Sequence, residues 1–193
     1  VMDTNAVWIA QELNAIGVQV GEMVTVSDEA GQITDTLNRL VGVFDLLIMT
    51  GGLGPTSDDI TKQTLAAYFD SKMVTIPEVH EKITAYFKEL GRSMIESNLL
   101  QADVPEVCRV LMNNHGTAPG MWFEKEGTIL VSLPGVPYEM KGLMTEKVLP
   151  EISSRVVVPD VVHRTIMTQG VPESYLAAML RDWEQALPEC VKL

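Results

Sequence analysis

An uninterrupted apolar run that leads straight into glycines constrains the fold of this 193-residue chain more than any other feature. Residues 46–49, Leu-Leu-Ile-Met, have no polar face, which is typical of a strand buried on both sides of a parallel sheet. Residues 50–61 then read TGGLGPTSDDIT, and the pattern of residues 59–69 predicts a helix. Ligands of open α/β folds bind where such strands end. The sequence therefore predicts an α/β fold with a binding site directly after residue 49.

The elements on either side of this unit alternate in the same way. Apolar spacing predicts further helices over residues 7–16, 30–41, 77–90, 138–148 and 173–187. Extended patterns predict strands over residues 18–26 and 161–167, and a hairpin of residues 121–123 with 128–133. This order predicts a three-layer, doubly wound, mostly parallel sheet covered by helices. Because the chain opens on a helix, one more strand is expected ahead of it.

Two prolines, Pro150 and Pro159, suggest a domain boundary. We expect a main domain over residues 1–150, a linker over residues 151–160 and a small second α+β element over residues 161–193. The last segment can barely support a core of its own. We therefore expect it to pack on the main domain or to be the truncated start of a further one.

Charge and composition exclude several classes of function. The formal net charge is −12, so a nucleic acid or an anionic membrane is not an expected partner. No apolar stretch approaches the roughly 20 residues that cross a bilayer, and the start does not resemble a signal peptide, so we expect a cytoplasmic protein. Cys108 and Cys190 are expected to be free thiols. The three histidines, His80, His115 and His163, lack metal-ligand spacing.

Residues 50–61, called loop 1 below, form the strongest candidate site. Three glycines let the backbone turn sharply and approach a ligand, and unpaired amides at the start of the next helix favour an anion. Loop 1 has neither the lysine of a P-loop nor the spacing of a dinucleotide fingerprint. We expect it to bind a phosphate-bearing, nucleotide-like small molecule through Thr50, Gly51, Gly52, Gly54, Pro55 and Thr56.

Two acidic residues in loop 1, Asp58 and Asp59, conflict with anion binding unless a cation is present. A divalent ion such as Mg²⁺ bridges carboxylate and phosphate and typically uses one or two protein carboxylates. Both residues are candidate catalytic groups, and Asp59 is the candidate metal ligand. The alternative is that both acids cap the following helix and favour its positive end.

Two further loops have a composition suited to binding. Loop 2, residues 113–120, reads NNHGTAPG, which could contact a sugar or base, although turn chemistry explains much of it. Loop 3, residues 133–139, reads LPGVPYE and again connects a strand to a helix. In one parallel sheet, all three loops would meet at the same rim. The candidate ligand-binding residues in loops 2 and 3 are Asn113, Gly116, Thr117, Pro119, Gly120, Pro134, Gly135 and Glu139.

Together, the motifs TGGLGPTSDDIT, NxxGTAPG and LPGVPYEM strongly resemble the amino-terminal domain of the competence/damage-inducible protein CinA family. That domain is similar in fold to molybdopterin-binding domains such as MogA and gephyrin. The resemblance covers residues 1–150 and implies a domain that is often a homodimer and that hydrolyses ADP-ribose with a divalent metal, Mg²⁺ or Co²⁺. By the same resemblance, Asp59 corresponds to an acidic residue of the molybdopterin enzymes. Asn5 corresponds to a family position near the ligand.

This chain also departs from the family pattern. The family has a strand ending in a glycine–aspartate–glutamate motif ahead of Asp3, and the sequence does not contain that motif. Residues 161–187 resemble the start of the small linking domain that follows in the family. The carboxy-terminal amidase domain of longer members is absent, so deamidation of nicotinamide mononucleotide is not expected.

Two functions of different classes are consistent with these motifs. In the first, a metal-dependent pyrophosphatase, loop 1 holds a pyrophosphate, Asp59 with Asp58 positions a divalent ion, and a metal-activated water attacks phosphorus. The sequence identifies no general base. In the second, the domain binds molybdopterin or a nucleotide without turnover. A purely structural fragment of a larger protein is a third hypothesis.

Overall fold

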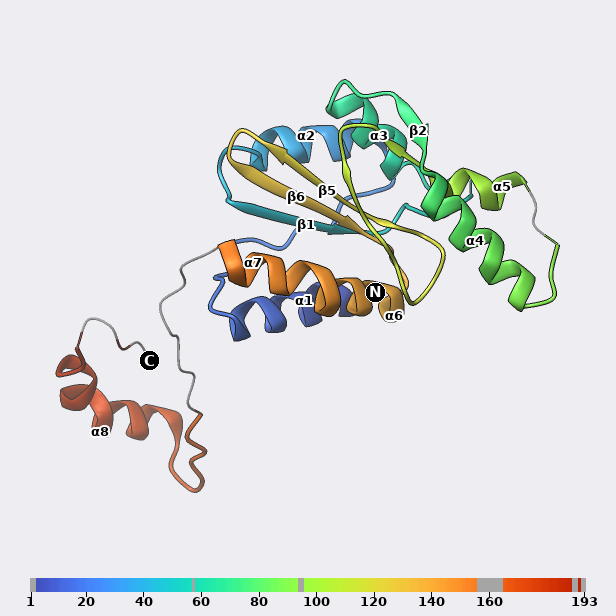
Figure 1. Ribbon diagram of the computed structural model, residues 1–193. Coiled ribbons are helices and arrows are strands. Elements are labelled where there is room, and N and C mark those ends of the chain that lie inside the picture. The colour runs from blue at the N-terminus through green and yellow to red at the C-terminus, as the bar shows by residue number, and fades with distance from the viewer. Residues whose placement is uncertain (1–2, 57, 94–95, 156–164, 189–190, 192–193) are drawn as a thin grey trace. The chain divides into compact units, whose positions relative to one another are not determined.

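The computed structural model describes residues 3–56, 58–93, 96–155, 165–188 and 191. The chain divides into two compact units, Val1–Asp160 and Val161–Leu193. The first unit contains a four-stranded sheet in the order β1-β6-β5-β4, with helices on both faces (Figure 1). The strands are β1 (Leu46–Thr50), β4 (Arg109–Leu111), β5 (Gly120–Lys125) and β6 (Thr128–Leu133).

The sheet is mixed. β1 pairs with β6 in parallel, from Leu46 with Ile129 to Thr50 with Leu133, whereas β5 pairs antiparallel with both β6 and β4. The predicted hairpin is confirmed as β5 and β6, and its turn residues Glu126 and Gly127 have positive φ angles of 53° and 81°. The α/β class with parallel pairing in the sheet is therefore confirmed.

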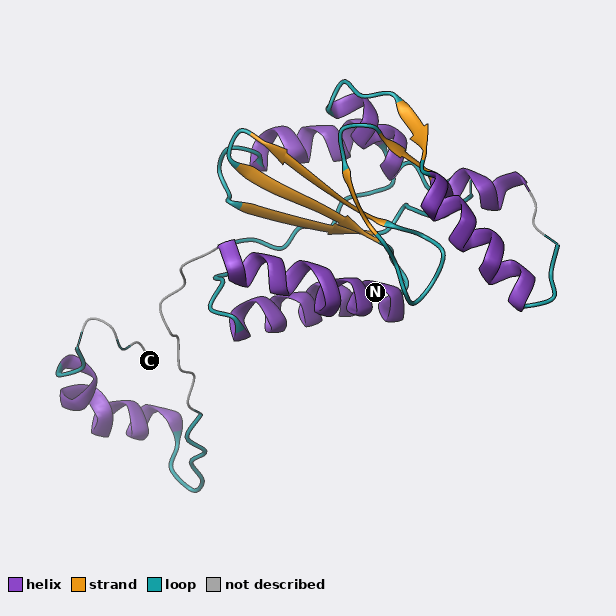
Figure 2. Ribbon diagram, viewed as in Figure 1, coloured by secondary structure: helices purple, strands orange, loops and turns teal. Residues whose placement is uncertain are grey.

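Helices form a layer on each face of this sheet (Figure 2). One layer contains α1 (Thr4–Ala15), α6 (Pro137–Leu143), a π-helical turn at Met144–Val148 and α7 (Leu149–Arg155). The other contains α2 (Ala30–Leu40) and α3 (Thr61–Tyr68). Alternate residues of β5 serve the two layers: Trp122 packs in the cluster with α1 and α6, while Met121 and Phe123 pack in the cluster with α2 and α3.

A smaller part of the first unit follows α3. It contains β2 (Met73–Thr75) and β3 (Asp103–Pro105), which pair antiparallel, together with α4 (Pro77–Glu89), α5 (Glu96–Leu99) and a 3₁₀ turn at Leu100–Ala102. The predicted helix over residues 77–90 is confirmed as α4. The buried ammonium of Lys62 on α3 holds this part in place, because it donates to the carbonyls of Leu100 and Asp103 at 2.9 and 3.0 Å.

Several boundaries differ from the predictions. Residues 18–26 form no strand, because strand formation needs a paired neighbour and none of the described strands pairs with them. Helix α3 begins at Thr61 rather than residue 59, since the preceding residues turn back within loop 1. Helix α7 covers the first half of the segment expected to be a linker, because Ile152 is buried in the core.

The second unit contains α8 (Glu173–Gln185), which confirms the helix predicted there. Residues 161–164 of the predicted strand lie outside the described residues, as does Cys190, and residues 165–167 form no strand. No side chain of α8 is buried, and its large side chains Tyr175, Met179 and Trp183 are exposed. The second unit therefore has no core of its own among the described residues.

Candidate functional site

Loops 1, 2 and 3 lie at one edge of the sheet. Loops 1 and 3 leave the carboxyl ends of the parallel strands β1 and β6. Loop 2 precedes β5, and because β5 runs antiparallel to β6, its start lies where β6 ends. The sheet topology therefore brings three loops to the same rim, although only two of them follow parallel strands.

Direct contacts join loop 1 to loop 3. The amide of Gly51 donates to the carbonyl of Leu133 at 2.9 Å, and a Cβ on Gly135 would lie 3.3 Å from the Cα of Gly51. Asn5, at the start of α1, donates from Nδ2 to the carbonyl of Gly135 at 2.9 Å, while its buried Oδ1 has no partner among the described residues. Gly51, Gly135 and Asn5, all candidate ligand contacts, are therefore neighbours.

Gly52 shows why loop 1 requires glycine. Its φ is +66°, a region that favours glycine, and a Cβ there would overlap the hydroxyl of Thr61. The amide of Thr61 donates back to the carbonyl of Gly52 at 3.2 Å, and the amide of Ile60 donates to Asp58 at 3.0 Å. These two amides are used within the loop, so the expectation that the amides at the helix start are unpaired is wrong at these positions.

Asp59 is held by loop 1 itself. Its Oδ2 accepts a hydrogen bond from the amide of Thr56 at 3.0 Å and another from the Thr56 hydroxyl. Burial opposes ionisation of Asp59, but these bonds, a bond from the Gly54 amide and the charge of Lys62 outweigh it, and its pKa lies below the ordinary value. The helix-capping alternative is not observed, since α3 has no side-chain cap and Asp58 is exposed.

Asp59 brings a carboxylate to loop 1 without a group of further acidic or histidine ligands around it among the described residues. Among the described residues, no group of three or more His, Cys, Asp or Glu side chains could enclose a metal ion. A Mg²⁺ ion that arrives with a diphosphate needs only one or two protein carboxylates, because phosphate oxygens and water complete its shell. The residues therefore fit a cation that is shared with the ligand and held by Asp59, and they do not fit a closed protein site.

A buried polar network joins loop 2 to helix α6. Asn113, which is 3% exposed, donates from Nδ2 to the carbonyl of Ala118 at 2.9 Å and to Glu139 at 2.5 Å, and its Oδ1 accepts from the amide of His115 at 2.8 Å. Burial raises the pKa of Glu139, which the bonds from Asn113 and the Ala118 amide only partly offset. Gly116 lies against Glu139 where a Cβ would overlap the carboxylate.

Other candidate residues of loops 2 and 3 lie inside the protein. Pro119, Gly120 and Pro134 are buried. A Cβ on Gly120 would lie 3.2 Å from Leu133 and 3.3 Å from Leu111, so this glycine serves the packing of the sheet. The half-buried Gly116 and Thr117 remain accessible parts of loop 2.

Sequence reasoning missed a second tie between loop 2 and the α6 region. Nε2 of His115 lies 2.6 Å from Oε1 of Glu146, and Asn114 donates to Oε2 of the same carboxylate at 2.9 Å. The His115 ring also packs edge-on against Tyr138, with centroids 5.0 Å apart. Glu146 lies 31 residues from His115, so no local pattern indicates this pairing; the only local signal is the density of polar groups in loop 2.

Comparison with known proteins places this site in a family. Residues 1–154 match the family described as the probable molybdopterin binding domain. A CinA-like protein from Flavobacterium psychrophilum is 46% identical over 197 residues, covering 100% of this chain and 46% of its own length. The chain belongs to the CinA family. A CinA-like protein from Cytophaga hutchinsonii is 44% identical over 97% of this chain and 45% of its own length, so the chain spans under half the length of both relatives.

Solved structures agree with the CinA assignment. CinA from Thermoplasma acidophilum superposes with a TM-score of 0.69 at 31% identity, covering 79% of this chain and 88% of that one. A molybdenum cofactor biosynthesis protein B superposes with a TM-score of 0.51 at 19% identity, covering 79% and 82% of the two chains, and supports the fold alone. Within the described residues, no helix has both the length and the apolar character needed to cross a membrane.

Proposed function

We propose that the first unit binds a phosphate-bearing nucleotide-like molecule at the rim made by loops 1, 2 and 3, and hydrolyses the diphosphate of a compound such as ADP-ribose with a divalent cation. The observation that carries this proposal is the meeting of Gly51 in loop 1, Gly135 in loop 3 and Asn5 at the start of α1, which brings the backbone of two loops and a polar side chain together at one point of the rim. Membership of a molybdopterin-binding-type family supports a small-molecule ligand.

Asp59 is the residue that would hold the cation. Its depressed pKa keeps it ionised at neutral pH, and Thr56 fixes its orientation. When bound, the ion would neutralise phosphate charge and lower the pKa of a coordinated water. Thr56, Gly51 and Gly135 would position the diphosphate beside it. A homodimer in the cytoplasm, without nucleic-acid or membrane partners, is part of the same proposal.

The second candidate function is binding of molybdopterin or a nucleotide without turnover. It is favoured by the engagement of Asp59 with Thr56 and by the absence, within the described residues, of a larger group of acidic or histidine side chains. Both candidates use the same rim, so a measurement of product separates them.

Incubation of the chain with ADP-ribose and either Mg²⁺ or Co²⁺ tests the proposal. Hydrolysis adds one water and releases AMP and ribose 5-phosphate, which chromatography detects. We expect Asp59→Asn to lower the rate roughly a hundredfold, because it removes a charge-stabilising group, while the matched exposed variant Asp58→Asn stays close to wild type.

The outcomes distinguish the hypotheses. Binding of ADP-ribose in calorimetry without release of AMP supports the non-catalytic module and contradicts hydrolysis. Equal rates for the two aspartate variants would remove Asp59 from the mechanism. If the chain shows neither binding nor a thermal shift with any nucleotide or pterin, only the structural-fragment hypothesis remains.

A further inference from the structure

Tyr138, on the first turn of helix α6, places an aromatic ring beside the rim. It follows Gly135 by three residues and is 68% exposed. Three residues span at most about 11 Å, so the backbone of Tyr138 lies within that distance of Gly135, which in turn lies against Gly51. A nucleotide-like molecule whose phosphate lies where Gly135 meets Gly51 can therefore reach Tyr138 with its other end.

Loops 1, 2 and 3 offer few other aromatic surfaces. Tyr138 is the only phenylalanine, tyrosine or tryptophan in their sequences, and His115 of loop 2 is the only histidine. Elsewhere in the first unit, a cation or a second ring lies over the rings of Trp8, Tyr68, Phe69, Trp122 and Phe123. A flat, conjugated ring stacks favourably on an accessible aromatic face. Among these three loops, Tyr138 supplies that face.

Loop 2 holds the Tyr138 ring in position. The ring of His115 meets it at 88° with the centroids 5.0 Å apart. His115 is itself fixed, since its Nε2 lies 2.6 Å from Oε1 of Glu146 and a Cβ on Gly142 would overlap its ring. One edge-to-face contact cannot cover both faces of the Tyr138 ring, which agrees with its exposure. Because the ring is already oriented, stacking costs little of the conformational freedom that a mobile side chain would lose.

The charges around Tyr138 favour the uncharged end of a ligand. Loops 2 and 3 contain no lysine or arginine, so they supply no permanent positive charge to a phosphate. Hydrogen bonds from His115 and Asn114 lower the pKa of Glu146, which keeps a negative charge beside His115. Phosphates are better held at loop 1, where the cation proposed for Asp59 would lie. The neutral, flat part of the ligand is therefore the part that Tyr138 faces.

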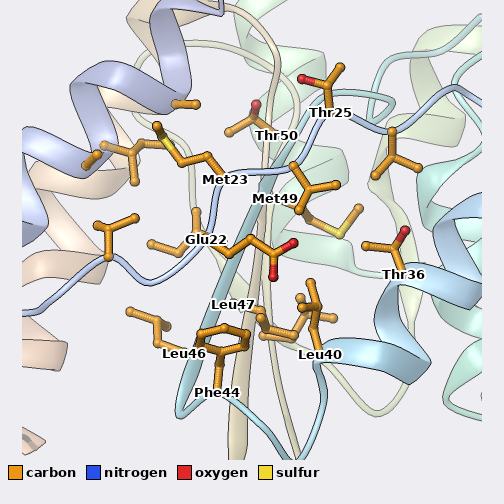
Figure 3. Close-up of a pocket in the computed structure, with 18 of the residues that line it drawn as sticks. Glu22, Met23, Thr25, Thr36, Leu40, Phe44, Leu46, Leu47, Met49 and Thr50 are labelled. Carbon is orange, nitrogen blue, oxygen red and sulfur yellow. The ribbon is translucent and has the colours of Figure 1, made fainter.

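A second space next to loop 1 is a cavity of about 390 Å³ along β1. Figure 3 shows Leu40, Phe44, Leu46 and Leu47 on its wall, whose side chains form no hydrogen bonds. The ring nitrogens of a heterocycle lodged among these side chains would lose their hydrogen bonds to water. The described lining of this cavity includes no residue of loops 2 or 3, so the cavity does not account for the open ring of Tyr138.

We propose that Tyr138 binds the flat heterocyclic end of the ligand by stacking, whether that end is an adenine base or a pterin ring. This inference rests on the proposed function, because it needs a ligand whose phosphates lie at loops 1 and 3. Val136, which is 54% exposed, lies between Gly135 and Tyr138 in sequence and offers an apolar surface to the group that links the two ends of the ligand. Stacking selects for a flat conjugated ring and tolerates different bases.

The test measures dissociation constants by calorimetry, with Mg²⁺ present, for AMP, for neopterin and for ribose 5-phosphate, which has no heterocycle. We expect Tyr138→Ala to weaken the binding of AMP, neopterin or both about tenfold and to leave that of ribose 5-phosphate unchanged. Tyr138→Phe keeps the ring and should bind as the wild type does. The matched control is Tyr175→Ala, because Tyr175 is 69% exposed on the first turn of α8 in the second unit. This control should change no dissociation constant.

The three probes separate the outcomes. A loss for AMP alone assigns the flat end to adenine, and a loss for neopterin alone assigns it to a pterin. Equal affinities of the wild type and Tyr138→Ala for every probe overturn stacking but leave phosphate binding at loop 1 intact. An equal loss for ribose 5-phosphate, or an equal loss in Tyr138→Phe, also overturns stacking, because the effect then does not depend on contact between two rings. If the wild type binds none of the three probes, stacking fails, and the proposed function fails with it only if ADP-ribose does not bind either.

Discussion

At the scale of single residues, glycines shape the rim as much as the residues with charged side chains do. Gly52 and Gly135, both part of the proposed binding rim, each lie against a neighbour that a Cβ would crowd, Thr61 and Gly51 respectively. Asp59 and Glu139 carry the charges, and their environments shift their pKa values in opposite directions. These residues therefore determine both the shape of the rim and the pH dependence of its charges.

Gly52→Ala separates backbone strain from steric overlap. Its φ of +66° is nearly that of Gly91 at +63°, but nothing lies within 4 Å of a Cβ on Gly91. We expect Gly91→Ala to lower the free energy of unfolding by about 1 kcal/mol through left-handed strain alone, and Gly52→Ala by roughly 2–4 kcal/mol with loss of ligand binding. Urea unfolding and calorimetry measure both quantities. Equal destabilisation of the two variants would contradict the overlap with Thr61.

The environment of Glu139 predicts that the stability of the protein depends on pH, and the variant Glu139→Gln tests this. Burial raises the folded-state pKa of Glu139 above its ordinary value of 4.5, so the folded protein holds this proton more tightly than the unfolded chain. The free energy of unfolding of the wild type therefore falls as pH rises through the interval between the two pKa values. Relative to wild type, Glu139→Gln should gain stability across that interval and keep a constant difference above it.

The opposite trend is expected for Glu124→Gln. Hydrogen bonds from Trp122 and Arg155 lower the pKa of Glu124, so its contribution to stability is present above the ordinary carboxyl pKa and is lost as pH falls through the folded value. Urea midpoints measured from pH 3 to pH 7 show both trends. If both variants changed the pH dependence of the urea midpoint in the same direction, the opposite pKa shifts of Glu139 and Glu124 would be contradicted.

At the scale of elements, local patterns predict structure where the element carries its own signal. The helices α1, α2, α4 and α8, the strand β1 and the β5–β6 hairpin all follow from periodicity and turn residues. The strands β2, β3 and β4 have three residues each, too few to show a period of two. Residues 18–26 have a strand pattern, but a strand also needs a paired neighbour. No local sequence pattern shows whether that neighbour is present. The glycines of the site follow from turn chemistry, whereas the tie from His115 to Glu146 depends on the fold.

The attachment of loop 2 to α6 gives a prediction at this scale. Asn113→Ala leaves Glu139, the Ala118 carbonyl and the His115 amide without their shared partner, so we expect a loss of about 2–3 kcal/mol in the free energy of unfolding and weaker ligand binding. The neighbouring variant Asn114→Ala removes only exposed bonds to Lys82 and Glu146 and should cost under about 0.5 kcal/mol. Urea unfolding of both variants, with calorimetric titration of ligand, checks this. Similar losses in the two would mean that the buried network does not hold loop 2.

At the scale of the whole molecule, the two units differ in what stabilises them. The first unit has hydrophobic cores on both faces of its sheet, and every buried apolar side chain among the described residues lies between Ile9 and Ile152. The second unit has one described helix without a buried side chain.

This distribution of the core predicts where the chain can be shortened. A chain that ends at Arg155 retains every buried apolar residue that the structure describes in the first unit, so its melting temperature and ligand affinity should match those of the 193-residue chain. A chain that ends at Val148 loses Leu149 and Ile152, which are 8% and 1% exposed. Burial of two such side chains contributes about 3–6 kcal/mol, which corresponds to a fall of roughly 10 °C in melting temperature. Thermal unfolding of both chains measures the two melting temperatures. A large fall in the melting temperature of the chain ending at Arg155 would show that residues after 155 stabilise the first unit, because no other part of its described core changes.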